Sequence, residues 1–307
     1  MSMRFPTTLL VFLAVLWVKA IYPPSSGIAD TDFYWHLTYG QWIVNHGELP
    51  SSDFFSWTFA GQPYQLTQWL GESAMGMAYN IAGLGGTKIL SVALAAITIG
   101  FAWLAACRYV HTSVALGLAL MCNLVQVVTP MRPQLFSFAL LSVAAYLVVS
   151  FLETRRFRFI IGYPVLMAAW VNLHGGFIVG LILIGLMATG VTAEAVLAGR
   201  LKSSVRDLLL TWGVVIASTL ATLINPYGIN AILTVVMIGG LRSSSVISEW
   251  MPVNLTTELG WFYLLNLVPF VALMAVSGCR PRRPTPATPP TPPQAPAGGP
   301  PRFPALA

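Results

Sequence analysis

The chain has 307 residues, of which 56% are hydrophobic and only 8% are charged. Soluble domains carry about 25% charged residues, so this composition excludes an ordinary soluble surface and indicates a protein that crosses a lipid bilayer several times. The formal net charge of +6 is divided among short loops, as membrane topology requires, and we expect no nucleic-acid partner.

Recurring apolar runs predict an all-α integral membrane protein with about eight transmembrane helices. The first run follows Arg4 and ends at "VKA", so it has a second interpretation as a cleaved signal peptide. The predicted spans are residues 6–22, 89–107, 112–129, 135–152, 159–173, 177–198, 207–225 and 260–278.

The loop charges predict an orientation in a plasma (inner) membrane, with the N-terminus and the C-terminus in the cytoplasm. Inner loops then hold eleven Lys and Arg residues and outer loops only four, which is the bias that the positive-inside rule describes. The inner set is Arg4, Arg108, Arg155, Arg156, Arg158, Arg200, Lys202, Arg206, Arg280, Arg282 and Arg283, and the outer set is Lys19, Lys88, Arg132 and Arg242.

A large outer loop, residues 23–87, follows the first span in this topology. Residues 31–46 form an amphipathic pattern that Asp30 or Thr31 can cap and that Gly47 can end. A second helix is expected over residues 67–82. Four tryptophans lie in the loop, and Trp favours the membrane–water interface, so we expect both helices to lie flat on the outer leaflet.

A change in composition divides the chain into two parts. Residues 1–278 form the predicted transmembrane domain. Residues 279–307 contain the run "RPRRPTPATPPTPPQAPAGGPP", which is rich in proline and cannot build a core, and this segment is predicted to be a disordered cytoplasmic tail.

The polar residues collect on the predicted outer face. Seven of the ten carboxylates fall there, together with the short motifs "TPMRPQ", "NLHGG", "NPYG" and "SEW". A guanidinium group can donate two parallel hydrogen bonds to phosphate oxygens. Arg132 is therefore the first candidate for binding a lipid phosphate, and Arg242 is the second. His174 and Glu72 are further candidates for the substrate-binding set.

Each candidate also has a structural interpretation. Asp30 can be a helix cap, and His36 can pair with Asp32 on one helix face, because the two residues are four positions apart. Arg132 can anchor to lipid headgroups, and His174 can belong to a packed turn. "NPYG" is more simply explained as a helix stop.

The motifs resemble those of the GT-C glycosyltransferases, in particular bacterial and largely uncharacterised GT-C-like proteins. The resemblance rests on "DTDFYWHLTYGQWIVNHGELPSSDFFSWTFAGQPY" and on the later segments "MRPQLFSF", "NLHGGF", "NPYG" and "SEW", and it covers residues 1 to about 278. The chain departs from the pattern at Thr67 and Gln68, where many relatives have His-Glu.

The resemblance implies a GT-C-like fold and an inverting transfer of a sugar from a polyprenyl-phosphate donor on the outer face. The acceptor would be a glycan, lipid or protein of unknown identity. Asp30 or Asp32 would be the catalytic base or would hold a divalent metal, Mg or Mn, and His36 joins them as a catalytic candidate.

Two other classes of function stay open. One is a non-catalytic or truncated membrane scaffold of the same family, since many GT-C proteins continue into further spans. The other is a lipid or solute transporter or flippase, which would place charged or broken-helix sites near the middle of the membrane, whereas the ionisable residues here lie near span ends.

Overall fold

The computed structural model describes residues 5–21, 31–123, 131–239, 254–257, 260–261 and 264. The regular elements among these residues are helices, and the extended pairing among them is a single antiparallel bridge between Ser52 and Pro63. The chain divides into two compact units, Met1–Asn254 and Leu255–Ala307. In the second unit, the Trp261 N–H donates to the Thr257 carbonyl. All helices discussed below belong to the first unit.

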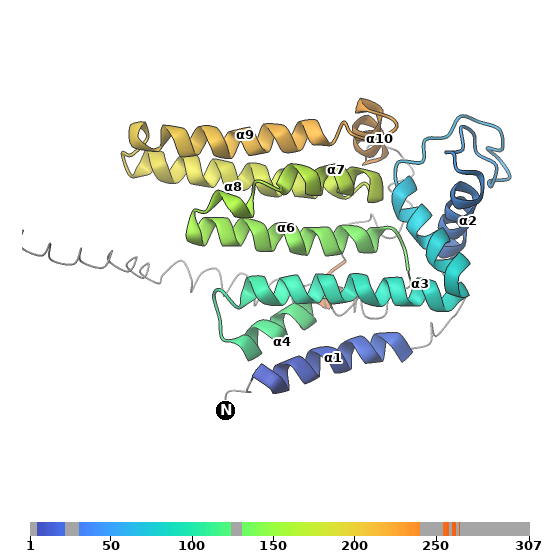
Figure 1. The fold of residues 1–307 in the computed structure, drawn as a ribbon, viewed down its shortest axis with the longest axis horizontal. Coiled ribbons are helices and arrows are strands. Elements are labelled where there is room, and N and C mark those ends of the chain that lie inside the picture. Colours follow the sequence, from blue (N-terminus) through green and yellow to red (C-terminus); the bar gives the residue numbers. More distant parts are fainter. Residues whose placement is uncertain are drawn as a thin grey trace, which may run out of the picture. The chain divides into compact units, whose positions relative to one another are not determined.

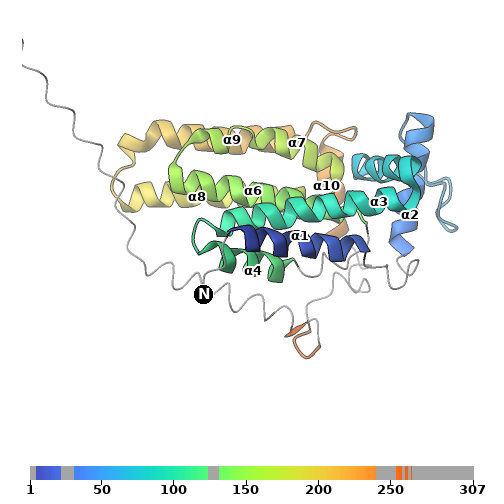
Figure 2. The ribbon, with the colours of Figure 1, turned by 60° about the horizontal axis from the view of Figure 1, so that its bottom comes forward.

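The first half of this unit is built around one long helix, α3 (Trp69–Ala106). Helix α1 (Phe5–Ile21) and helix α4 (Thr112–Cys122) lie alongside the C-terminal part of α3 (Figure 2). Their shared core contains Ile99, Trp103 and Leu116, which are all buried. These three helices are apolar all round, which is typical of helices in a membrane or in a deep core.

The second half is a bundle of α6 (Gln134–Thr154), α7 (Tyr163–Leu173), α8 (Phe177–Leu197) and α9 (Val205–Ala221), which run side by side (Figure 1). Short 3-10 turns, Phe157–Phe159 and Lys202–Ser204, precede α7 and α9. Trp170 and Tyr163 are fully buried at the centre, and the Tyr163 hydroxyl donates to the Gly180 carbonyl at 2.8 Å.

Among the described residues, four helical stretches are long and apolar enough to cross a membrane: Trp69–Ala106, Gln134–Thr154, Phe177–Leu197 and Lys202–Ala221. Large apolar side chains such as Ile182, Leu186 and Leu209 point outward from them, as expected for lipid-facing surfaces. The prediction of a helical membrane-spanning protein is therefore supported. The count of eight remains a prediction, because most of residues 260–278 and part of 112–129 lie outside the described residues.

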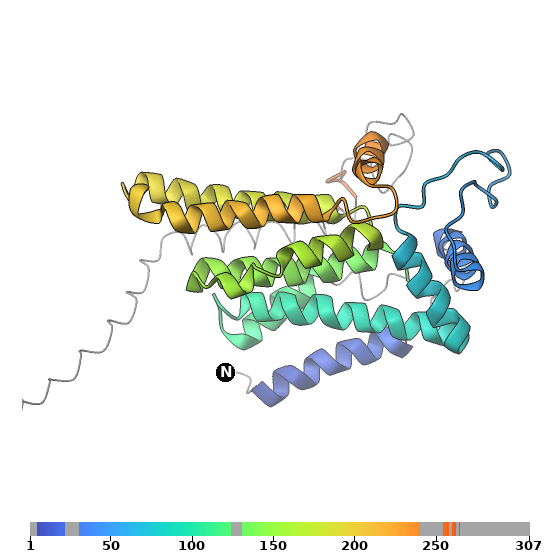
Figure 3. The ribbon, with the colours of Figure 1, turned by 45° about the horizontal axis from the view of Figure 1, so that its top comes forward.

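Helix α2 (Thr31–His46) has the bounds that the sequence predicts, and it runs across one end of the bundle (Figure 1). The predicted helix 67–82 and the predicted span 89–107 both lie in α3, on either side of a kink at Ala82 and Gly83. Gly83 has a φ of 59°, a value that favours glycine. Helix α10 (Ile229–Gly239) was not predicted (Figure 3).

Candidate functional site

The α2 end of the bundle depends on a very close crossing between α2 and the first part of α3. A Cβ atom on Gly40 would overlap the carbonyl oxygen of Glu72, and one on Gly76 would overlap the backbone of Gly40. Only glycine allows this approach. Phe33 and Leu37 of α2 fill the space beside the crossing, whereas Val44, further along the same helix, is exposed.

This crossing brings His36 of α2 against Glu72 of α3. Their Nδ1 and Oε1 atoms are 2.8 Å apart, and the residues are 7% and 0% exposed. Gln68, one turn before Glu72, donates from its side-chain amide to the same oxygen at 3.1 Å. The second oxygen of Glu72 is buried and has no hydrogen-bond partner among the residues that the structure describes.

An ion pair lies on the more open side of α2. Arg132, from the segment before α6, places Nη1 3.1 Å from Oδ2 of Asp32. The Arg132 side chain is 17% exposed, and that of Asp32 is 44% exposed. The structure thus joins a cation and a carboxylate that the sequence singles out in separate motifs.

His174 occupies the turn between α7 and α8. Its Nδ1 accepts a hydrogen bond from the Gly176 N–H at 3.0 Å and lies 2.8 Å from the Ser137 hydroxyl, which itself accepts from the Trp170 indole. Burial lowers the pKa of His174 to about 4, so the imidazole is neutral near pH 7. These contacts favour the packed-turn interpretation of "NLHGG".

Three long-range hydrogen bonds, which no local sequence pattern predicts, connect the motifs. The Trp69 indole donates to the side-chain oxygen of Asn172 at 2.8 Å, while the Asn172 amide donates to the Ile224 carbonyl. The Tyr227 hydroxyl accepts from the Leu66 N–H at 3.0 Å. "NPYG" therefore does more than end α9, because its tyrosine holds the α2–α3 connection in place.

The connection between α2 and α3 is itself ordered by Asp53. Its carboxylate accepts hydrogen bonds from the Ser56 hydroxyl at 2.6 Å, from the Ser56 and Phe55 N–H groups, and from the Tyr39 hydroxyl at 3.1 Å. The hydrogen bonds from Ser56 contribute most to lowering the pKa of Asp53 to about 2. With its oxygens engaged in this way, Asp53 organises the loop.

The remaining sequence candidates, Asp30 and Arg242, lie outside the described residues. Of the two proposed metal ligands, only Asp32 is therefore placed. Within the described part of the chain, no three His, Cys, Asp or Glu side chains lie close enough together to hold a metal ion.

No protein-family model matches the chain, and neither a curated protein nor a solved structure is significantly similar to it.

Proposed function

We propose that the protein is a GT-C-type membrane glycosyltransferase, which moves a sugar from a polyprenyl-phosphate donor to an acceptor on the outer face of the membrane. The observation that carries the proposal is the Asp32–Arg132 ion pair at the α2 end. It places a half-exposed carboxylate next to a guanidinium, and these are the two groups that a transfer from a lipid phosphate needs.

In the proposed step, the acceptor hydroxyl oxygen attacks the anomeric carbon of the donor sugar and gives its proton to Asp32. The bond between the anomeric carbon and the phosphate oxygen breaks with inversion, and the bond electrons leave with the polyprenyl phosphate. Arg132 exchanges part of its contact with Asp32 for the phosphate oxygens, which gain negative charge as the bond breaks.

The buried pair His36–Glu72 supports the proposed site by fixing the position of α2, which carries Asp32. Because His36 is held by Glu72, the face of α2 that carries Asp32 is fixed relative to α3. We assign His36 and Glu72 a positioning role in this proposal, since both are buried while Asp32 is open. The eight-span topology and the orientation belong to the same proposal, and place the α2 end at the outer leaflet.

The test uses the purified full chain in lipid nanodiscs with a panel of polyprenyl-phosphate sugars. Donor consumption is measured for the wild type, Asp32→Asn and Arg132→Ala. We expect Asp32→Asn to keep donor binding and to lose at least a hundredfold in turnover, as for a lost general base. Arg132→Ala should weaken donor binding by about tenfold or more, because a charge-assisted contact to phosphate is lost.

Matched controls separate chemistry from folding. Glu48→Gln removes an exposed carboxylate close to the end of α2, and Arg206→Ala removes an exposed arginine from the α9 region; both should match the wild type. If no donor binds or reacts, or if Asp32→Asn turns over normally, the transferase proposal fails and the scaffold interpretation takes its place. Donor binding without a product would instead favour the transporter class.

A further inference from the structure

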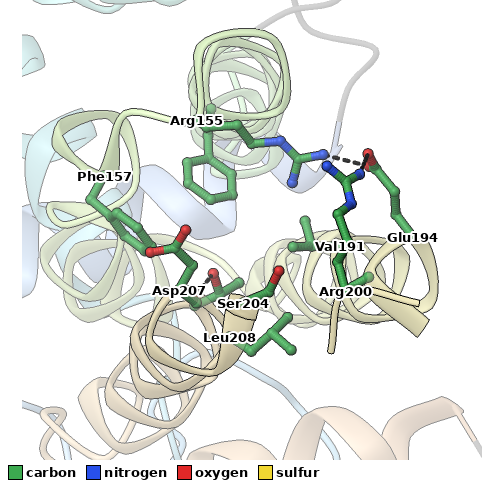
Figure 4. Close-up of a pocket in the computed structure, with 11 residues that line it drawn as sticks. Arg155, Phe157, Val191, Glu194, Arg200, Ser204, Asp207 and Leu208 are labelled. Carbon is green, nitrogen blue, oxygen red and sulfur yellow. Dashed lines mark hydrogen bonds and ion pairs between the residues drawn. The ribbon is translucent and has the colours of Figure 1, made fainter. Parts of the chain in front are cut away.

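A second site lies at the end of the bundle opposite α2. A pocket of about 190 Å³ opens between the end of α6, the end of α8 and the start of α9 (Figure 4). Its floor is apolar and includes the buried side chains of Phe151, Val191 and Leu208. Its rim carries charges of both signs, contributed by Arg155, Glu194, Arg200 and Asp207.

The charged residues on the rim form two groups on opposite sides of the pocket. Glu194 pairs with Arg155, whose Nη2 lies 2.5 Å from Oε2, and Arg200 Nη2 lies 3.9 Å from the other carboxylate oxygen. One carboxylate thus faces two guanidiniums, which leaves this side with one net positive charge. Asp207 lies across the pocket from the pair (Figure 4), and its carboxylate contacts no hydrogen-bond or ion-pair partner within the described ranges.

We propose that this pocket binds a phospholipid headgroup of the phosphoethanolamine class. The phosphate would bind to Arg155 and Arg200, because guanidinium groups bind phosphate oxygens through paired N–H donors. The primary ammonium would donate hydrogen bonds to Asp207. The separation of charge across the rim therefore matches a zwitterion with an anion at one end and a hydrogen-bonding cation at the other.

Other headgroups fit the rim less well. An anionic headgroup without an ammonium would bring no positive charge to Asp207 and would place its own negative charge close to that carboxylate. A choline headgroup has a cation that cannot donate hydrogen bonds. The surfaces beside the pocket suit acyl chains, because Leu152, Val205 and Leu209 are apolar and exposed on α6 and α9. This favours a lipid over a soluble small molecule with the same charges.

The test measures lipid retention on the delipidated full chain in detergent. Native mass spectrometry counts bound lipid from an equimolar mixture of phosphatidylethanolamine, phosphatidylcholine and phosphatidylglycerol with identical acyl chains. We expect the ethanolamine lipid to be retained roughly tenfold over the choline lipid, as for one hydrogen-bonded charge pair. Asp207→Asn should bring this ratio close to one.

Two more variants keep the test decisive if Asp207→Asn folds poorly. Arg200→Gln should lower retention of all three phospholipids by about five- to tenfold, because each carries the phosphate. Lys202→Gln removes a nearby positive charge that does not line the pocket, and it should retain the wild-type pattern.

A separate arm distinguishes the sources of the headgroup. Soluble phosphoethanolamine, tested by thermal stabilisation of the same protein, should have little effect at concentrations where the lipid saturates. Stabilisation equal to that of the lipid would overturn the lipid assignment and indicate a small-molecule site. Absence of a headgroup preference in the wild type, or a preference that survives Asp207→Asn, would also overturn it. None of these readouts requires glycosyltransferase activity.

Discussion

His36 Nδ1 lies 2.8 Å from Glu72 Oε1, and this contact joins two helices whose backbones meet at Gly40 and Gly76. Glu72 is fully buried, and its other carboxylate oxygen has no partner within the part of the chain that the structure describes. Burial of a carboxylate with one unpaired oxygen is unfavourable for folding. The effect of a substitution at this position on stability therefore depends on which atoms replace the carboxylate.

The loss of stability on replacing Glu72 should therefore depend on the shape and the hydrogen-bonding groups of the new side chain. Glu72→Ala removes the partner of His36 and leaves a cavity, and we expect a loss of about 2–4 kcal/mol in the free energy of unfolding. Glu72→Gln keeps an oxygen for His36 and Gln68 and should cost within about 1 kcal/mol. Unfolding in mixed micelles measures both. Equal losses for the two variants would show that the contact with His36 does not determine stability.

Because α2 and α3 cross so closely, we expect larger residues at the two glycines of the crossing to destabilise the protein. Gly40→Ala and Gly76→Ala each insert a methyl group into a backbone contact, and we expect each to cost at least about 2 kcal/mol in unfolding free energy. Gly190→Ala is the matched control, since a Cβ on this α8 residue meets no atom within 4 Å. It should stabilise the protein by roughly 0.5–1 kcal/mol, because alanine is the better helix former. If Gly40→Ala behaves like Gly190→Ala, the crossing is looser than the structure indicates.

We expect the α2–α3 connection to open at acid pH, because its hydrogen bonds depend on the ionised carboxylate of Asp53. Its folded pKa of about 2 is below its ordinary value of 3.8, so the ionised form stabilises the loop above about pH 4. That stabilisation is lost as the pH falls from about 4 to about 2. Hydrogen exchange of the Phe55 and Ser56 amides, corrected for intrinsic rates, should show protection that declines over this window.

Asp53→Asn is the corresponding variant. It should show weaker protection of the same amides at pH 7 and little change in that protection between pH 5 and pH 2. A pH-dependent loss that persists in Asp53→Asn would mean that another group titrates in the loop.

Asn172 links α3 to the segment after α9, and its replacement should lower the free energy of unfolding. Asn172→Ala takes the acceptor from the Trp69 indole and the donor from the Ile224 carbonyl, and we expect a loss of about 2–3 kcal/mol in the free energy of unfolding. Asn80→Ala, which removes longer hydrogen bonds from an exposed asparagine, should cost under about 0.5 kcal/mol. Thermal melts of the two variants side by side decide the matter, and similar melting temperatures would contradict the prediction.

Local features of the fold could be predicted where the sequence carries local signals. Helix α2 begins at Thr31 and ends at His46, as predicted, because Gly47 takes a φ of 72° and stops it. The apolar runs of α6, α8 and α9 are close to their predicted bounds, because a long apolar run is itself a local signal. Helix α10 was missed because its eleven residues are too short for a span, and "NPYG" before it indicates only a stop.

The contacts of the candidate site could be predicted only in part. Asp32, His36 and Arg132 stand out as rare polar residues in an apolar chain, and the structure places them at one end. Their partners carry no such signal. Nothing in the sequence joins Trp69 to Asn172, or His36 to Glu72, because these pairs arise from helix crossings between distant segments. Gln68 appears in the sequence only as a departure from the family pattern, yet it contacts Glu72.

The hydrogen bond between the Leu66 N–H and the Tyr227 hydroxyl has a consequence for biosynthesis. The two residues are 161 positions apart, so a ribosome adding about 5–20 residues per second incorporates Leu66 roughly 8–32 s before it incorporates Tyr227. During that interval the α2–α3 connection, with Trp57 and Phe59 exposed, lacks the contact that secures it in the finished protein. The α2 end can thus be secured only late in translation, and a nascent chain released before Tyr227 would carry Asp32 and His36 without this support.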